Sequence, residues 1–343
     1  MKAVKWYAPR DMRLVDMDRP KPKPHEVLLR IESVGVCGSD LHYYLEGRIG
    51  SAVITSPLVL GHEFGGIVEE VGSEADVSLL GKRVAVEPGI PCMKCEWCTT
   101  GHYNVCLNMQ FPGGPPHHGA FCEYYCVHAG FCFPVPDVID AAESAMIEPL
   151  AVAIHTLELA QLKPGESVAI LGLGPIGLLV AQVAKFCGAG YIYGTDLHDY
   201  RVDAGLRYGV DEAFSAAKHD THATIMELTK KRGVDVVLDC ARSSDTLGIA
   251  CKVARPGGRC VLTGISGEEN DPLPVGVARR KELTLQWCRR FLRNFPTAID
   301  LVARGKIDVK SLVTHSFTLE KTRDAFELVC SNTDNVLKAS IDF

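Results

Sequence analysis

Two neighbouring segments near the start of the sequence carry side chains that are natural zinc ligands. The first is Val36-Cys37-Gly38-Ser39-Asp40 and the second is Leu60-Gly61-His62-Glu63-Phe64. Together they offer a thiolate, an imidazole and a carboxylate, and three protein ligands with one open position are typical of a catalytic zinc site. We therefore interpret these segments as holding a reactive Zn2+ that meets a substrate oxygen.

The surroundings of these residues favour metal binding, although core packing of the same side chains is the alternative. Cys37 and His62 each follow a strand-like segment and lie in a turn that contains glycine. Asp40 is close enough in the chain to orient His62 as a hydrogen-bond acceptor. Glu63 and Glu148 are the candidates for the remaining ligand positions. Glu148 precedes a proline inside a helical pattern, where proline marks a kink or a break.

A group of four thiols predicts a second, structural metal site. Cys92, Cys95, Cys98 and Cys106 fall within fifteen residues, with two, two and seven residues between successive cysteines. Four thiolates at this spacing suit a tetrahedral zinc ion. Incidental buried cysteines are the alternative, but the segment is polar and rich in turns, unlike a core strand. We expect this zinc to hold together a lobe, residues 91–107, that lacks a core of its own.

Length and composition limit the possible classes of protein. The chain has 343 residues, 47% of them hydrophobic and 23% charged, which suits a globular protein of two domains. Its net charge of −6 argues against nucleic acid and anionic membranes as partners. No apolar run approaches the roughly 18 residues of a membrane span, and the first residues have no signal-peptide pattern. We expect a cytoplasmic protein, whose fourteen cysteines bind metal or lie buried instead of forming disulfides.

The predicted elements change character along the chain. Residues 1–35 alternate apolar and polar positions between prolines, which is typical of antiparallel β-structure, and residues 121–135 return to a strand-like pattern. After Pro164 short apolar strands alternate with helical patterns; the strands are 167–171, 191–196, 234–239 and 259–264. Buried strands that alternate with helices predict a doubly wound parallel sheet, so the expected fold class is α/β.

A glycine-rich turn directly follows the first of these apolar strands. The turn is Gly172-Leu173-Gly174-Pro175-Ile176-Gly177, and an apolar helix begins within it. Its glycines allow backbone N–H groups to approach a pyrophosphate at the start of the helix. Asp196 ends the next strand and suits ribose hydroxyls, so NAD is favoured over NADP. Arg201 could still accommodate a 2′-phosphate, and a turn that uses glycine only for packing is the alternative.

Taken together, these motifs resemble the zinc-dependent medium-chain dehydrogenase/reductase family over nearly the whole chain. The sorbitol/xylitol (polyol) dehydrogenase branch is the most similar, because Ile147-Glu148-Pro149 stands where simple alcohol dehydrogenases place a ligand cysteine. The segments His42-Tyr43 and Gly47-Arg48-Ile49-Gly50 also resemble that branch. The resemblance implies a GroES-like β-rich catalytic domain at 1–150 and 286–343 and a Rossmann domain at 151–285.

The resemblance also implies a role for each matching residue. The catalytic zinc would be held by Cys37, His62 and Glu63, with Glu148 bound to it directly or through water. NAD would be bound by Gly172, Gly174, Pro175, Ile176, Gly177, Asp196 and Arg201. The polyol would contact Tyr43, Glu148, Arg290 and Phe291, and the last of these replaces a tyrosine of the family, so one hydroxyl donor is missing.

The expected function is zinc-dependent oxidation of a polyol to the ketose with hydride transfer to NAD. Ser39 and His42 would relay the substrate proton, because a hydroxyl group cannot be the final base; a surface histidine on a turn is the alternative for His42. The resemblance implies a homotetramer, or a dimer. A threonine- or simple-alcohol-type dehydrogenase, and a non-enzymatic NAD-binding zinc sensor, are the competing functions.

Overall fold

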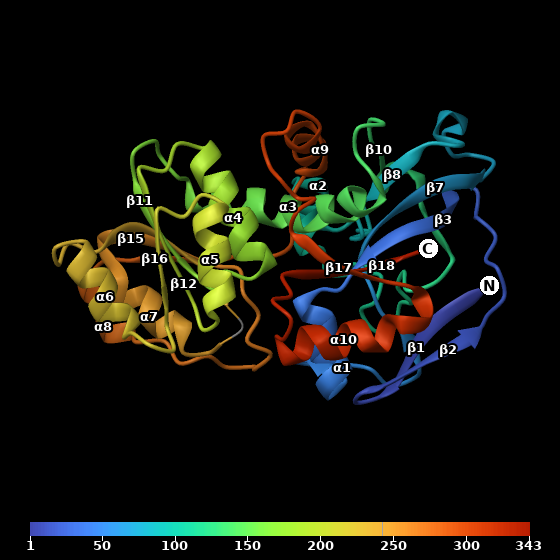
Figure 1. The fold of residues 1–343 in the computed structure, drawn as a ribbon. Helices are drawn as coiled ribbons and strands as arrows, with labels where there is room; N and C mark the ends of the chain where they lie inside the picture. The colour runs from blue at the N-terminus through green and yellow to red at the C-terminus, as the bar shows by residue number, and fades with distance from the viewer. Residues whose placement is uncertain (242) are drawn as a thin grey trace. The chain divides into compact units, whose positions relative to one another are not determined.

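The computed structural model describes residues 1–241 and 243–343, which form two compact units. Unit 1 comprises Met1–Glu148 and Phe295–Phe343, and unit 2 comprises Pro149–Asn294. The chain therefore passes from the first unit to the second and returns, as the colours in Figure 1 show. None of the described helices is long and apolar enough to cross a membrane.

Unit 1 is built on a seven-stranded sheet, in keeping with the β-like alternation of its sequence. The strand order is β10-β8-β7-β3-β18-β17, and β9 also pairs with β3. Only β17 and β18 run parallel to each other. The bounds are β3 (Glu26–Gly35), β7 (Glu63–Val71), β8 (Arg83–Val86), β9 (Tyr124–His128), β10 (Cys132–Pro134), β17 (Val313–Phe317) and β18 (Lys338–Asp342).

Smaller elements surround this sheet. A three-stranded sheet has the order β2-β1-β6, and β4 pairs with β5. These strands are β1 (Lys2–Ala8), β2 (Asp11–Asp16), β4 (Arg48–Ile49), β5 (Ala52–Val53) and β6 (Leu58–Val59). The helices that belong wholly to unit 1 are α1 (Gly38–Glu46), α2 (Glu96–Thr99), α9 (Phe295–Ala303) and α10 (Thr322–Ser331). Four short 3-10 turns are η1 (Val77–Leu79), η2 (Tyr103–Val105), η3 (Ala129–Phe131) and η4 (Leu319–Lys321).

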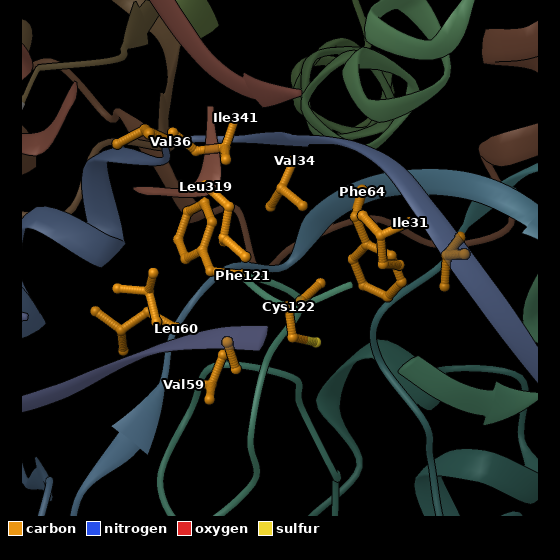
Figure 2. Packing of buried hydrophobic residues seen from close by; sticks show 14 of the residues in the cluster. Ile31, Val34, Val36, Val59, Leu60, Phe64, Phe121, Cys122, Leu319 and Ile341 are labelled. Carbon is orange, nitrogen blue, oxygen red and sulfur yellow. The ribbon is translucent and has the colours of Figure 1, made fainter. Parts of the chain in front are cut away.

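Unit 1 contains one large apolar core. It gathers residues that are distant in sequence, including Val34 and Val36 around the end of β3, Phe64 in β7 and Ile341 in β18. Figure 2 shows these side chains packed with Leu60 and Phe121. Because protein cores are close-packed, this contact fixes where the segments that flank Cys37 and His62 can lie.

Unit 2 is the predicted doubly wound domain. Its six strands are all parallel, in the order β13-β12-β11-β14-β15-β16, which is the dinucleotide-binding order with its switch point between β11 and β14. The strands are β11 (Ser167–Leu171), β12 (Tyr191–Asp196), β13 (Glu212–Ser215), β14 (Val234–Asp239), β15 (Ala254–Leu262) and β16 (Thr284–Trp287). The helices are α4 (Pro175–Phe186), α5 (Asp199–Arg207), α6 (Thr221–Leu228), α7 (Thr246–Val253) and α8 (Val275–Arg280).

The boundary segments differ in detail from the sequence expectation. Helix α3 (Ala141–Ala160) is assigned as one helix through Pro149, so no break in it occurs there. The return to unit 1 falls at Phe295, not at residue 286. The intervening residues stay with unit 2 because the backbone of Cys288 hydrogen-bonds to Leu262 and the Asn294 side chain donates to Glu158.

A buried carboxylate joins three strands of unit 2. Asp235 accepts hydrogen bonds from the backbone and hydroxyl of Ser167 in β11, at 2.9 and 2.6 Å, and from Arg232 at 2.7 Å and Arg255 at 2.6 Å. Burial raises the pKa of Asp235, but these hydrogen bonds outweigh burial and hold the pKa far below its usual range. The ionised carboxylate therefore stabilises the fold.

We predict that Asp235→Asn lowers the free energy of unfolding by about 1.5–3 kcal/mol at pH 7, the usual contribution of hydrogen bonds to a charged group. An unfolded aspartate has a pKa of about 3.9, so the stabilisation is present above that pH and is lost as the pH falls further. Urea unfolding should thus show a difference from wild type that shrinks below about pH 4. Asp300→Asn, which removes an exposed partner of Arg304, is the control; an equal loss in both variants would contradict the assignment.

Candidate metal centre and dinucleotide site

The ends of two paired strands bring the three candidate ligands of the first metal site together. Cys37 follows β3 and is the N-cap of α1, while Glu63 is the first residue of β7. Strands β3 and β7 pair antiparallel with Gly35 opposite Glu63. The ligand atoms of Cys37, His62 and Glu63 consequently lie within 4.8 Å of one another.

Asp40 links the two ligand segments. Its carboxylate accepts hydrogen bonds from the backbone N–H of Cys37 at 3.2 Å and of Gly61 at 3.3 Å. The same carboxylate lies 3.4 Å from Nδ1 of His62. This contact is the one expected from the sequence, and it leaves Nε2 of His62 as the ring nitrogen that can bind a metal.

The charges around His62 suit a cation. Burial lowers the pKa of His62, but the negative charges of Asp40 and Cys37 outweigh burial and raise it well above its usual value. The surroundings of the ring thus favour a positive charge, which a bound metal ion would supply.

Lys338 is a site residue that the sequence analysis missed. It lies in β18, is only 3% exposed, and its Nζ contacts Oε2 of Glu63, itself 1% exposed. Burial lowers the pKa of Lys338, but the charges of Glu63, Cys37 and Glu148 raise it above its usual value. The one feature of the sequence that could have identified Lys338 is its position as a charged residue inside the apolar strand pattern of residues 336–341. Phe111, whose ring centroid lies 5.1 Å from that of His62, was also missed.

The other residues predicted for this site lie on two helices. Ser39, in α1, places its hydroxyl 3.3 Å from Sγ of Cys37 and 3.4 Å from Nε2 of His62. His42 and Tyr43, also in α1, are buried. Glu148 in α3 is buried and acts electrostatically on Lys338. It is not part of the three-residue ligand group found among the described residues, so its direct binding to zinc stays a prediction.

The four predicted cysteines of the second site also come together. The sulfur atoms of Cys92, Cys95, Cys98 and Cys106 lie within 4.8 Å of one another, on the loop that carries α2 and η2. Hydrogen bonds from the backbone of Lys94 and Cys95 lower the pKa of Cys92 to about 6, which favours its thiolate. Burial raises the pKa of Cys98 to about 12, so it is the arrangement of the four sulfur atoms that fits a structural zinc ion.

In unit 2 the glycine turn has the shape that a dinucleotide requires. Gly172 has φ +90, and a Cβ there would lie 2.9 Å from the backbone nitrogen of Ala241. A Cβ at Gly177 would overlap the carbonyl oxygen of Gly172. Pro175 and Ile176 begin α4, whose N-cap is Gly174. The backbone can therefore approach a pyrophosphate at the N-terminus of α4.

Asp196 and Arg201 lie beside this turn. The Asp196 carboxylate accepts hydrogen bonds from the backbone of Leu173 at 2.9 Å and of His198 at 3.0 Å. Nη1 of Arg201 lies 3.9 Å from the same carboxylate and 3.9 Å from the position of a Cβ on Gly174. Each carboxylate oxygen keeps a lone pair for a ribose hydroxyl, so the residues fit a dinucleotide.

Two of the predicted substrate contacts, Arg290 and Phe291, lie near the end of unit 2. Arg290 has φ 58, a left-handed backbone conformation that is uncommon for a residue other than glycine. Phe291 is 2% exposed. Its burial shows that it packs within the protein, and its contact with substrate stays a prediction.

We predict that Cys37→Ser lowers the zinc content from two to one per chain, because it removes one of three ligands from one of the two groups. Dehydrogenase activity should fall below detection while the far-ultraviolet circular dichroism stays unchanged. Atomic absorption on protein purified without chelators measures the metal. Cys187→Ser, at an exposed cysteine, should keep both zinc ions, and a fully active, zinc-poor Cys37→Ser variant would contradict the metal site.

Comparisons with known proteins identify the two domains and the family. Residues 23–137 match the alcohol dehydrogenase GroES-like domain, and residues 175–304 match the zinc-binding dehydrogenase domain. The chain is 38% identical over 341 residues to a sorbitol dehydrogenase of Bacillus subtilis, covering 99% of this chain and 97% of that one. It is 38% identical over 320 residues to D-xylulose reductase A of Aspergillus niger, covering 91% and 89%.

A solved structure extends the similarity to the whole fold. The alcohol dehydrogenase rspB of E. coli CFT073, complexed with the cofactor NADH, is 29% identical and matches with a TM-score of 0.92 over 100% of this chain and 99% of that one. The predicted fold class, zinc and nicotinamide cofactor are thereby confirmed. The chain belongs to the zinc-dependent medium-chain dehydrogenase/reductase family, in its polyol dehydrogenase branch, and is an oxidoreductase of CH–OH groups.

Proposed function

We propose that this chain oxidises a secondary hydroxyl of a polyol to the ketone and passes the hydride to NAD. The observation that carries the proposal is the group formed by Cys37, His62 and Glu63, with the buried Glu148 in the same unit. Two carboxylates give this site a polar, hydrogen-bonding character that suits a second hydroxyl of the substrate. The polyol and ketose named for the two sequence relatives support the same substrate class.

Zinc, when bound, would lower the pKa of a substrate hydroxyl, and NAD would accept the hydride. The protein must then hold the hydroxyl proton. Ser39 is placed for this task, since its hydroxyl lies 3.3 and 3.4 Å from two ligand atoms. A serine cannot keep the proton, so we propose that His42, three residues on in α1, receives it. Nδ1 of His42 lies 3.9 Å from the half-exposed Glu46 carboxylate, which can pass the proton to water.

The remaining predicted residues bind substrate and cofactor. Tyr43 and Arg290 would donate hydrogen bonds to further hydroxyl groups of the polyol, and Phe291 would contribute only packing. Asp196 would bind the ribose hydroxyls and repel a 2′-phosphate, which favours NAD over NADP. The glycine turn 172–177 would receive the pyrophosphate.

We predict that sorbitol, xylitol or galactitol with NAD gives a kcat/KM at least about tenfold above that with threonine or butanediol, because polar groups of the site stay unpaired when the substrate lacks the further hydroxyls of a longer polyol. NADP should be worse than NAD by a similar factor. Reduction of the cofactor at 340 nm measures both. A preference for threonine or butanediol would indicate the competing dehydrogenase types, and two bound zinc ions without any turnover would indicate a sensor.

We further propose that the chain is a homo-oligomer, with a tetramer favoured, in the cytoplasm. Strand β16 lies at the edge of the unit 2 sheet and pairs with β15 alone in the described part of the chain. Its Trp287 is 61% exposed, and an open edge with exposed apolar side chains suits pairing with a second copy. Among the described residues no cysteine forms a disulfide, which suits a reducing compartment.

Light scattering after size-exclusion chromatography should therefore give a mass above the 37.3 kDa of one chain. Trp287→Glu should reduce that mass, because a charge at the strand edge opposes pairing. Lys310→Glu, at an exposed lysine of unit 1, is the control. A monomeric wild-type protein would contradict the oligomer, and fractionation of cells that express the chain tests its compartment.

A further inference from the structure

The segment 288–294, which carries Arg290, contains two strained backbone positions. Arg290 has φ 58 and Arg293 has φ 62, and both values lie in the left-handed region that residues other than glycine seldom adopt. Such conformations persist only where the surrounding structure holds them in place, and they are frequent at binding and active sites. The contacts that hold this segment therefore bear on its function.

Hydrogen bonds of Cys288 hold the start of this segment. Its backbone N–H donates to the carbonyl oxygen of Leu262, at the end of β15, at 2.8 Å. Its thiol donates to the carbonyl oxygen of Arg290 at 3.5 Å. The hydroxyl of Thr156 in α3 lies 3.5 Å from the same sulfur atom. The peptide group that follows Arg290 is thus tied, through Cys288, to β15 and α3.

The side chain of Asn294 holds the end of the segment. Its Oδ1 accepts a hydrogen bond from the backbone N–H of Leu292 at 2.7 Å, which closes the turn around Arg293. Its Nδ2 donates to Oε1 of Glu158, in α3, at 2.9 Å. Asn294 is only 2% exposed, so a side chain without this amide would leave the N–H of Leu292 without its acceptor. One amide therefore fixes the turn and attaches it to α3.

The carboxylate of Glu158 is itself held in place. Its Oε2 lies 3.2 Å from Nδ1 of His155, which is one turn earlier in α3 and 6% exposed. The side chain of Glu158 is 54% exposed, so a substitution there does not open a cavity in the core. Glu158 can therefore be changed to test the contact with Asn294 without disturbing the packing of the protein.

We infer that Asn294 is a positioning residue that, together with Glu158, holds the segment 288–294 so that Arg290 can bind the polyol. The buried Phe291 anchors the same segment by packing. Asn294 belongs neither to the three-residue metal group nor to the glycine turn 172–177, so loss of its amide should weaken polyol binding and leave NAD binding unchanged. This inference rests on the proposed function, which supplies the contact between Arg290 and the substrate.

The test measures Asn294→Ala, Arg290→Ala and the double variant on the polyol that the wild-type enzyme oxidises best. In Asn294→Ala the KM for the polyol should rise about tenfold, because a displaced binding group loses substrate affinity. Its kcat and its KM for NAD should stay within about twofold of wild type, the pattern of lost uniform binding. Arg290→Ala should raise the KM for the polyol at least as much. The double variant should match Arg290→Ala alone, because Asn294 acts through Arg290.

Substitutions of the half-exposed Glu158 test the same contact if Asn294→Ala fails to fold. Glu158→Met removes the acceptor of the Asn294 amide and should raise the KM for the polyol in the same direction. Glu158→Gln keeps an oxygen for that amide and should give a KM close to wild type. Glu227→Met, at an exposed glutamate of α6, is the matched control and should change neither KM nor kcat.

Two results would overturn the inference. The first is a wild-type KM for the polyol in Asn294→Ala or in Glu158→Met. The second is a KM in the double variant that exceeds that of Arg290→Ala by the full factor seen in Asn294→Ala, since a merely structural role would act in both backgrounds. A wild-type KM in Arg290→Ala would refute the proposed substrate contact as well, so the two failures are distinguishable.

Discussion

The metal centre depends on the contacts that the carboxylate of Asp40 makes. It is buried, it accepts hydrogen bonds from the backbone of Cys37 and Gly61, and it contacts Nδ1 of His62. One side chain thus sets the start of α1, the turn before β7 and the orientation of the imidazole. A charged acceptor in a low-dielectric interior fixes geometry strongly, because any displaced donor would be left unpaired.

The two units bind different kinds of ligand: unit 1 uses side chains, whereas unit 2 uses the backbone. In unit 1 the ligands come from side chains at the ends of paired antiparallel strands, and the apolar core around Val36 and Phe64 holds those ends in place. In unit 2 the backbone of the glycine turn offers the binding surface, and glycine is required where a Cβ would overlap neighbouring backbone atoms. The first arrangement suits a small cation and the second suits an extended anion.

Much of this organisation follows from sequence. The spacing of the four cysteines, the glycine turn after an apolar strand and Asp196 at the next strand end each depend on local geometry, so they identify their sites without a structure. Lys338 could not be found in this way, because its role depends on β18 pairing beside β3 from the far end of the chain. The return point at Phe295 was missed for a related reason: the hydrogen bonds of Cys288 and Asn294 that hold the preceding residues have no pattern in sequence.

The position of β18 has a consequence for how the sheet of unit 1 folds. Strand β18 pairs with β3 and β17, although β3 and β18 lie far apart in the sequence. Pairing of such distant segments is slow, because the entropy of closing the long loop between them is lost before the contact is gained. The sheet that carries Cys37 and Glu63 is therefore completed by a contact of high contact order, whereas neighbouring strands of unit 2 are joined by shorter connections.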